Sequence, residues 1–438
     1  MIGIALMTPL SLLLSLFVFS SALAAEISVS VPPAVSGHEA ILEVNYRLTC
    51  DQSRESFRRL RMTPVTVSHE GRRIRLDLFE ERDQARVQLG KVAAGKALQL
   101  LVDESTGCRF EHLGVSVLPL DQSDPVRALV LQHSPFVVVR PNQYANRYND
   151  IPLAMAYATQ TFDNGTVWIR YTAYFSDEDL MTIGTNREEM MARYGRRSDI
   201  EWVYQVEISA EGEVLSRKYH SALFLEIGHS EKEFQGTFLP GTQHPILYNV
   251  QDNNVFSAFP KGLQRKARLE GHHLVPDSAI EYPEARERLQ LHQPWIFRVS
   301  DLENYREDRR VTLASQYLYV VFRGFLESGA FTLSVKLDSG KNFQAGGGEG
   351  DIDRLGEDLW KRETMSAIPL GRDILRGIEE GSIHGRVLVK NTSFFDPKLH
   401  VEKLRFYRLR RQNGRYEAID LTERFRCGLD GFPGVCEF

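Results

Sequence analysis

Two acidic residues near the middle of the chain have the spacing of a paired carboxylate site. Asp199 and Glu201 belong to Asp199–Ile208, a segment in which polar and apolar residues alternate. Side chains two positions apart on a β-strand point to the same face, about 6.5–7 Å apart along the chain. Two such carboxylates can bind a ligand or a divalent cation, or act as acid and base in hydrolysis.

Three histidines follow this pair along the chain and could complete the site. They are His220, His229 and His244. Imidazole transfers protons near neutral pH and binds zinc, although the spacing of these residues matches no metal-binding motif. We therefore predict a ligand-binding site of these histidines with Asp199 and Glu201, and treat a bound divalent metal as the weaker alternative.

These residues also have a structural interpretation. The two carboxylates could pair with Arg196 or Arg197 on a solvated sheet face, and the histidines could be ordinary core or surface residues. A second acidic cluster, Gly346–Asp353, places three carboxylates at alternate positions, as oxygen ligands of Ca²⁺ would be. It lacks the EF-hand spacing, and a solvated loop is the interpretation we prefer.

Composition and missing motifs exclude several classes of function. The formal net charge of −5 gives no electrostatic basis for binding nucleic acid. The sequence contains no H-E-x-x-H, G-x-S-x-G, P-loop or G-x-G-x-x-G motif. Aromatic residues make up 10% of the chain, and on strands they form a core more often than a face that stacks on sugars or peptides. We predict no nucleic-acid partner, and keep carbohydrate or an envelope protein as candidate partners.

The first 24 residues have the composition of a secretory signal peptide. They contain no charged side chain, Leu10–Val18 is almost entirely apolar, and Ala22–Ala24 fits the A-x-A cleavage rule. The lack of an N-terminal Lys or Arg keeps an uncleaved membrane anchor as the alternative. No later stretch is long and apolar enough to span a bilayer. We expect a periplasmic or secreted protein with no membrane span after cleavage.

All four cysteines follow that segment. An even number in an exported chain indicates disulfides rather than catalytic thiols or metal ligands. Four cysteines allow three pairings, and we favour the two between sequence neighbours, Cys50–Cys108 and Cys427–Cys436. The residues between Cys427 and Cys436 are rich in turn formers, so this short loop can fold back on itself.

Short alternating strands dominate the rest of the chain and predict a mainly β, multi-domain protein. The spacing of strands in residues 25–122 indicates an immunoglobulin-like β-sandwich clamped by one disulfide. Residues 123–300 form a central β-rich domain after a linker at Asp121–Pro125, and residues 301–438 a jelly-roll-like sandwich.

The central domain has the clearest local signals. Asp163–Gly165 lies between two aromatic-rich runs and indicates a β-hairpin. Thr185–Tyr194 has the cap and acidic first turn of a short helix, and Asp199–Ile208 is predicted as a strand. Residues 260–295 show no clear period and are assigned to connecting structure.

Several central segments follow one another in an order that resembles a known family. They are Asn149–Leu153, Val167–Tyr171, Gly195–Val203, His220 and His244–Tyr248. The order is similar to that of the vacuolar protein sorting-associated protein 62 family, in which an Asp-x-Pro-Leu strand, a G-x-x-x-D-x-E strand and a late His-Pro segment recur. Where that family tends to carry Gly-Ser-His, this chain has Asp252–Phe256. The resemblance implies a β-rich fold, and the family has no settled biochemical activity.

These observations predict an exported binding or scaffolding protein of the cell envelope with a ligand site in the central domain. The alternative is a hydrolase of envelope or extracellular polymers that uses the paired carboxylates. A third interpretation is a purely structural envelope protein.

Overall fold

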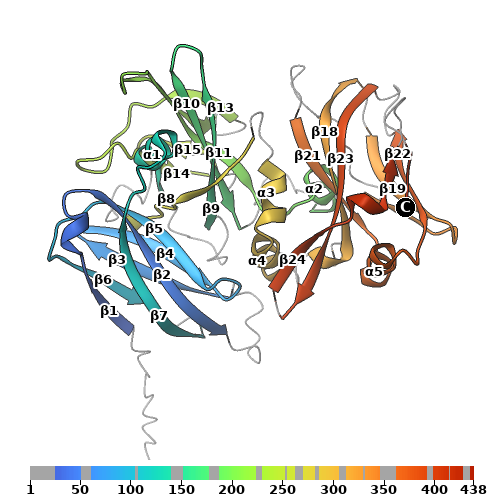
Figure 1. Ribbon diagram of the computed structural model, residues 1–438, viewed down its shortest axis with the longest axis horizontal. Coiled ribbons are helices and arrows are strands. Elements are labelled where there is room, and N and C mark those ends of the chain that lie inside the picture. The colour runs from blue at the N-terminus through green and yellow to red at the C-terminus, as the bar shows by residue number, and fades with distance from the viewer. Residues whose placement is uncertain are drawn as a thin grey trace, which may run out of the picture.

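The computed structural model describes residues 25–50, 61–103, 107–139, 151–176, 187–222, 229–251, 254–261, 270–281, 286–304, 312–328, 331–345, 362–391, 398–413, 415–427 and 435–438. The described chain is mainly β and forms three sheet-based units, which confirms the predicted fold class (Figure 1). The predicted signal peptide and the acidic Gly346–Asp353 segment lie outside the described residues.

The first unit is a β-sandwich of antiparallel strands. One sheet has the order β1-β6-β3-β4 and the other β5-β2-β7. Alternation in β2 points Leu42, Val44 and Tyr46 into a shared core, where all three are buried. The elements are β1 (Ala25–Ser30), η1 (Pro33–Val35), β2 (Glu39–Cys50), β3 (Met62–His69), β4 (Arg72–Phe79), β5 (Gln84–Lys91), β6 (Ala97–Val102) and β7 (Cys108–Pro119).

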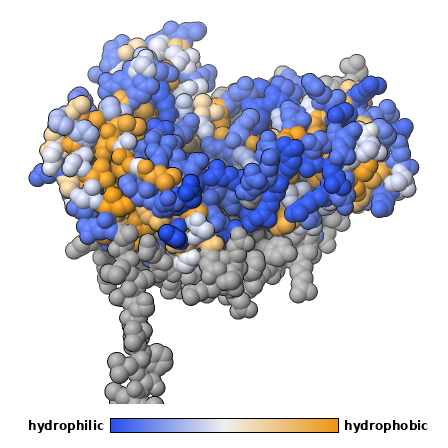
Figure 2. Space-filling model, turned by 60° about the horizontal axis from the view of Figure 1, so that its bottom comes forward, coloured by the Kyte–Doolittle hydropathy of each residue, from blue (hydrophilic) through white to orange (hydrophobic). Residues whose placement is uncertain are grey.

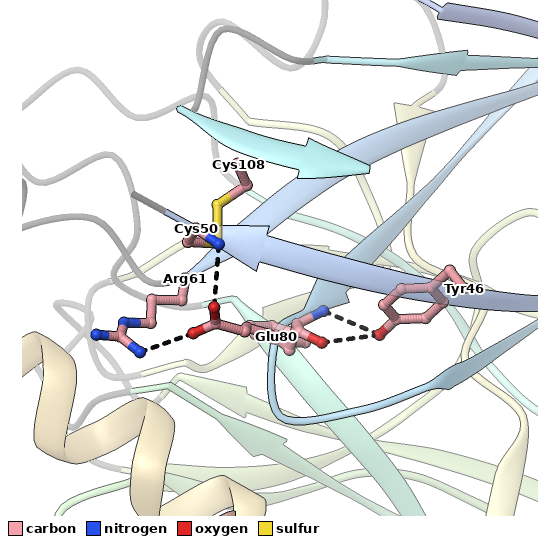
Figure 3. Close-up of a disulfide and its surroundings, with 6 residues drawn as sticks. Tyr46, Cys50, Arg61, Glu80 and Cys108 are labelled. Atoms are coloured by element: carbon pink, nitrogen blue, oxygen red, sulfur yellow. Dashed lines mark hydrogen bonds and ion pairs between the residues drawn. A yellow bond between two sulfur atoms is a disulfide. The ribbon is translucent and has the colours of Figure 1, made fainter. Parts of the chain in front are cut away.

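The predicted Cys50–Cys108 disulfide is confirmed and joins the end of β2 to the start of β7. Beside it, Glu80 binds two groups at once (Figure 3). Its Oε1 accepts a hydrogen bond from the Cys50 amide at 3.0 Å, and its Oε2 lies 2.7 Å from the Arg61 guanidinium. The carboxylate therefore ties the turn after β4 to the disulfide.

The central unit is one curled sheet with the order β17-β9-β10-β11-β12-β15-β14-β8, and β13 also pairs with β12. The predicted hairpin joins β9 to β10, and Gly165 in its turn has a φ of 80°, which favours glycine. The strands are β8 (Phe136–Val138), β9 (Pro152–Thr161), β10 (Val167–Phe175), β11 (Ile200–Ile208), β12 (Val214–Ala222), β13 (His229–Glu233), β14 (Ile246–Asn249), β15 (Phe256–Ser257) and β17 (Pro276–Ala279), whereas β16 (Glu270–Gly271) joins the first sandwich.

Helices lie beside the sheets. The predicted short helix is present as α2 (Arg187–Tyr194), which packs on the third unit, because its Met191 shares a buried core with Met365. α3 (Arg286–His292) and α4 (Trp295–Asn304) lie between the central and third units (Figure 1). The end of the predicted linker forms the start of a helix, α1 (Pro125–Gln132). The Asp124 carboxylate caps this helix by accepting hydrogen bonds from the backbone amides of Val126 and Arg127. No helix in the described ranges is long and apolar enough to cross a membrane.

The third unit packs the sheet β21-β18-β23-β24 against the sheet β20-β19-β22-β26-β25. The predicted Cys427–Cys436 disulfide is confirmed and joins β25 to β26. Phe438 and Gly385 exchange two backbone hydrogen bonds, so the C-terminal hairpin is part of the sheet. The elements are η5 (Ala314–Gln316), β18 (Tyr317–Ser328), β19 (Phe331–Leu337), β20 (Asn342–Gln344), β21 (Arg362–Pro369), α5 (Arg372–Glu380), β22 (Gly385–Asn391), β23 (Lys398–Gln412), β24 (Arg415–Asp420), η8 (Thr422–Arg424), β25 (Arg426–Cys427) and β26 (Val435–Glu437).

Residues 270–281, which we call the connecting segment, belong to both of the first two units. β16 pairs in parallel with β4 of the first sandwich, and β17 pairs in parallel with β9 of the central sheet. Between β16 and β17, the His273 carbonyl accepts a hydrogen bond from the backbone amide of Gln88 in β5 at 2.9 Å. The prediction of connecting structure for residues 260–295 is wrong for these strands, which at two to four residues are too short to show a period, and for α3, which spans Arg286–His292.

The surface differs between the units. In Figure 2 the left lobe, which carries the first and central units, shows more apolar surface on this face than the right lobe, which carries the third. The exposed large apolar side chains among the described residues all belong to the first two units: Leu101, Leu113, Leu118, Phe162, Leu215 and Phe259.

Candidate functional site

The structure places the predicted site residues in two parts of the central unit. Asp199, Glu201 and His220 lie near the end of the sheet where β11 and β12 are no longer paired, beyond Tyr204 and Tyr219. His244 lies far from Asp199. β14 ends at Asn249, which is linked to Asp199 through Asn254, whereas His244 precedes the start of β14. The five extended residues from His244 to Asn249 span about 16 Å, so the two lie at opposite ends of this strand. For His229 the structure describes the backbone, which pairs with Ala222.

Asp199 precedes the strand that was predicted to contain it, since β11 begins at Ile200. Its side chain is buried, and both carboxylate oxygens are hydrogen-bonded. Oδ1 accepts the Ile200 amide at 2.8 Å, and Oδ2 accepts Asn254 Nδ2 at 2.9 Å. Asn254 Oδ1 in turn accepts Asn249 Nδ2 at 2.6 Å. A buried carboxylate held in this way links three segments of the chain, so its observed role is structural.

Glu201 and His220 form a close pair from neighbouring strands. Glu201 Oε2 lies 3.0 Å from His220 Nδ1, with side chains that are 14% and 4% exposed. The His220 ring also stacks on Trp202, with ring centres 5.1 Å apart and planes inclined by 25°. The carboxylate therefore fixes an imidazole that already packs against an indole.

The stacking continues from Trp202 to β10. The guanidinium carbon of Arg170 lies 5.0 Å from the ring centres of both Trp168 and Trp202. Nε and one terminal nitrogen of Arg170 donate to Gln205 Oε1 at 3.1 and 2.8 Å, which holds the guanidinium plane in place. We call Trp168, Arg170, Trp202 and His220 the aromatic ladder. Arg170 and Trp202 are partly exposed.

His244 belongs to a different cluster, between the first and central units. Its Nδ1 donates to the Ser134 carbonyl at 2.9 Å, and its Nε2 lies 3.4 Å from Glu39 Oε2 in β2. The His273 ring is 4.3 Å away, edge to face, and its Nε2 lies 3.3 Å from Ser134 Oγ. Ser134 Oγ also donates to Gln88 Oε1 at 3.0 Å. We call Glu39, Gln88, Ser134, His244 and His273 the junction cluster.

Most of this cluster, and the ion pair beside it, were not predicted from the sequence. His272 Nε2 lies 2.7 Å from Asp77 Oδ2, and Arg75 lies 2.9 Å from the other oxygen of Asp77. Burial alone would raise the pKa of Asp77, but Arg75 and His272 outweigh it and lower that pKa to about 2. Adjacent histidines on an extended segment point to opposite faces, which was the one available signal: His272 meets Asp77, and His273 meets Ser134.

The junction cluster contains the residue types of a hydrolytic triad. Ser134 Oγ lies 3.5 Å from His244 Nδ1, and His244 Nε2 faces Glu39. Ser134 and His244 are both fully buried, however, and the Ser134 hydroxyl has acceptors in Leu131 and Gln88. A nucleophile must contact its substrate, which the buried Ser134 cannot do in the observed fold. The contacts of this cluster instead join the first and central units.

Metal binding can be assessed for the described part of the chain. There, no group of three or more His, Cys, Asp or Glu side chains is arranged to hold a metal ion. Arg196 and Arg197 donate to the backbone carbonyls of Ser198 and Thr312.

Comparison with known proteins adds no family assignment. The chain matches no protein-family model and shows significant similarity to no curated protein. The resemblance to the vacuolar protein sorting-associated protein 62 family therefore stays a prediction, and the function must be argued from the geometry.

Proposed function

We propose that this is an exported binding or scaffolding protein of the cell envelope, periplasmic or secreted, whose central unit binds carbohydrate. The two disulfides indicate an oxidising compartment outside the cytoplasm. The signal-like composition of the first 24 residues supports export.

The observation that supports carbohydrate binding is the Glu201–His220 pair beside the aromatic ladder. Sugar rings present C–H groups on their faces and hydroxyl groups around their edges. Ligand sites for such molecules combine aromatic rings with a few fixed polar groups. Trp202 offers the ring, while Glu201 and Arg170 offer an acceptor and a donor within the same part of the sheet.

The hydrolase alternative receives less support. It requires two carboxylates that can reach a glycosidic bond, one as acid and one as base or nucleophile. Asp199 is 1% exposed and accepts hydrogen bonds on both oxygens. Glu201 is 14% exposed and can contact a ligand on its own, without Asp199. One accessible carboxylate is enough for binding but not for this hydrolytic mechanism.

Titration calorimetry with a panel of soluble peptidoglycan fragments and neutral and acidic oligosaccharides tests the proposal. We expect at least one of them to bind, and Trp202→Ala and Glu201→Gln each to weaken that binding at least about tenfold. Glu111→Gln, in the exposed Arg47–Glu111 pair of the first unit, is the matched control and should bind normally. No binding by the wild-type protein, or equal binding by Trp202→Ala, would contradict the proposal. Release of new reducing ends from a bound oligosaccharide would favour the hydrolase.

A further inference from the structure

The contact between the first and central units is rich in buried histidine. His133, His244 and His273 are each no more than 4% exposed. The contact also includes backbone bonds: the Gln88 amide donates to the His273 carbonyl, and Val87 forms a bridge with Leu274. We infer that this contact is acid-sensitive, and that it opens when its buried histidines take up protons.

Two of these imidazoles are too close to carry a charge each. The rings of His244 and His273 are 4.3 Å apart and shielded from water. Glu39 Oε2 of β2 lies 3.4 Å from His244 Nε2. The charges that act on His273 are His244 itself and Arg72 from β4, both of which disfavour a second positive charge. The doubly protonated state is therefore accommodated by separation of the units rather than within the closed contact.

The surroundings of His133 and His273 favour their neutral forms. Burial, and after it Arg217 of β12 and His244, lowers the pKa of His133 to about 4. Burial, and after it His244, holds the pKa of His273 well below its usual value. Once exposed, both imidazoles would protonate near pH 6.5. The open state consequently binds more protons than the closed state between about pH 6.5 and 4, so closure weakens as the pH falls through this range.

Two carboxylates near the contact act in the opposite sense. Burial raises the pKa of Asp277, against the effect of Arg86 and Arg127, and burial raises that of Glu81, against Arg298. Protonation of these groups in acid would favour the closed state. The test must therefore isolate the histidines by substitution instead of relying on pH alone.

Hydrogen–deuterium exchange measured by mass spectrometry tests the inference. After correction for intrinsic rates, protection of the peptide containing Gln88 should fall at least about tenfold between pH 7.5 and pH 5. The peptide containing Leu421, whose amide bonds to Phe406 in the third unit, should keep its protection and serves as the internal reference.

Two substitutions decide the cause. His273→Gln keeps an amide donor toward Ser134 but cannot be protonated, so it should reduce the loss of protection at least about threefold. His133→Gln is the second variant if His273→Gln does not fold, and it should reduce the loss at least about threefold. The control is His112→Gln, at an exposed position of β7, which should behave as wild type. Equal protection at both pH values in the wild type, or an unchanged loss in the folded histidine variants, would overturn the inference.

Discussion

Two histidine–glutamate pairs of this chain have similar separations and different surroundings. Beside the aromatic ladder, Glu201 Oε2 lies 3.0 Å from His220 Nδ1, and the imidazole stacks on partly exposed Trp202. In the junction cluster, Glu39 Oε2 lies 3.4 Å from His244 Nε2, and the imidazole is fully buried between two units. The residue types are the same, so their surroundings decide the role. Glu201 and Glu39 are equally exposed, at 14%, so the difference lies in the imidazole: that of His220 stacks on a partly exposed indole that a ligand could contact, and that of His244 packs against buried His273.

The largest effect of substitution is expected at the junction. Asp77→Ala removes the buried carboxylate that pairs with Arg75 and His272 and leaves His272 in a buried setting without that partner. The free energy of unfolding, measured by urea denaturation, should fall by roughly 3–5 kcal/mol. Glu111→Ala, which breaks an exposed pair with Arg47, should cost less than about 1 kcal/mol. Equal losses in the two variants would remove the distinction between the buried junction and the surface.

The same carboxylate predicts a second acid response, at lower pH than that of the histidines. Because its native pKa is lowered to about 2, Asp77 stabilises the fold fully above its unfolded pKa near 4. That contribution, roughly 2 kcal/mol, is lost as the pH falls toward 2. Urea midpoints of the wild type should drop over this range, and those of Asp77→Ala should drop less. Parallel pH profiles would contradict the assignment.

An intermediate effect is expected in the network behind Glu201. Asn254 has a φ of 45°, so Asn254→Gly keeps the backbone conformation while it removes the amide between Asp199 and Asn249. The two groups left without this partner are buried, and the expected loss of stability is about 1–3 kcal/mol. Oligosaccharide affinity should weaken together with stability if this network positions Glu201. Unchanged affinity with reduced stability would confine the network to a purely structural role.

A smaller change in stability is expected in the ladder itself. Arg170→Lys keeps the charge but loses the planar group that stacks on Trp168 and Trp202 and bonds to Gln205. Thermal unfolding should show a loss of about 1 kcal/mol, and calorimetry a several-fold weaker affinity for the bound oligosaccharide. A loss of stability as large as that of Asp77→Ala would mean that the ladder, too, mainly holds the fold together.

The features that could be predicted from sequence are those set by neighbouring residues. The hairpin at Gly165 follows from turn chemistry, β11 follows from its alternation, and both disulfides follow from cysteine spacing in an exported chain. Within the predicted site, Glu201 and His220 come together because they lie on neighbouring strands of the sheet.

The junction could not be predicted because its contacts join distant parts of the chain. His272 and Asp77 are 195 positions apart, and Ser134 and His273 are 139 apart. A local sequence pattern does not predict which strand a short segment such as β16 will pair with. We predicted that the sheet brings His244 and Asp199 together, but His244 lies at the opposite end of β14 from Asn249, which belongs to the hydrogen-bond network of Asp199.

The most direct test compares one substitution from each pair in a single thermal-unfolding experiment, with and without the oligosaccharide that binds most tightly. We expect Glu201→Gln to keep the melting temperature within about 2 °C and to lose the ligand-induced increase. His244→Ala should lower the melting temperature by roughly 5 °C and retain that increase. A Glu201→Gln protein that is still stabilised by the ligand, or a His244→Ala protein that has lost the ligand response but not its stability, would contradict these expectations.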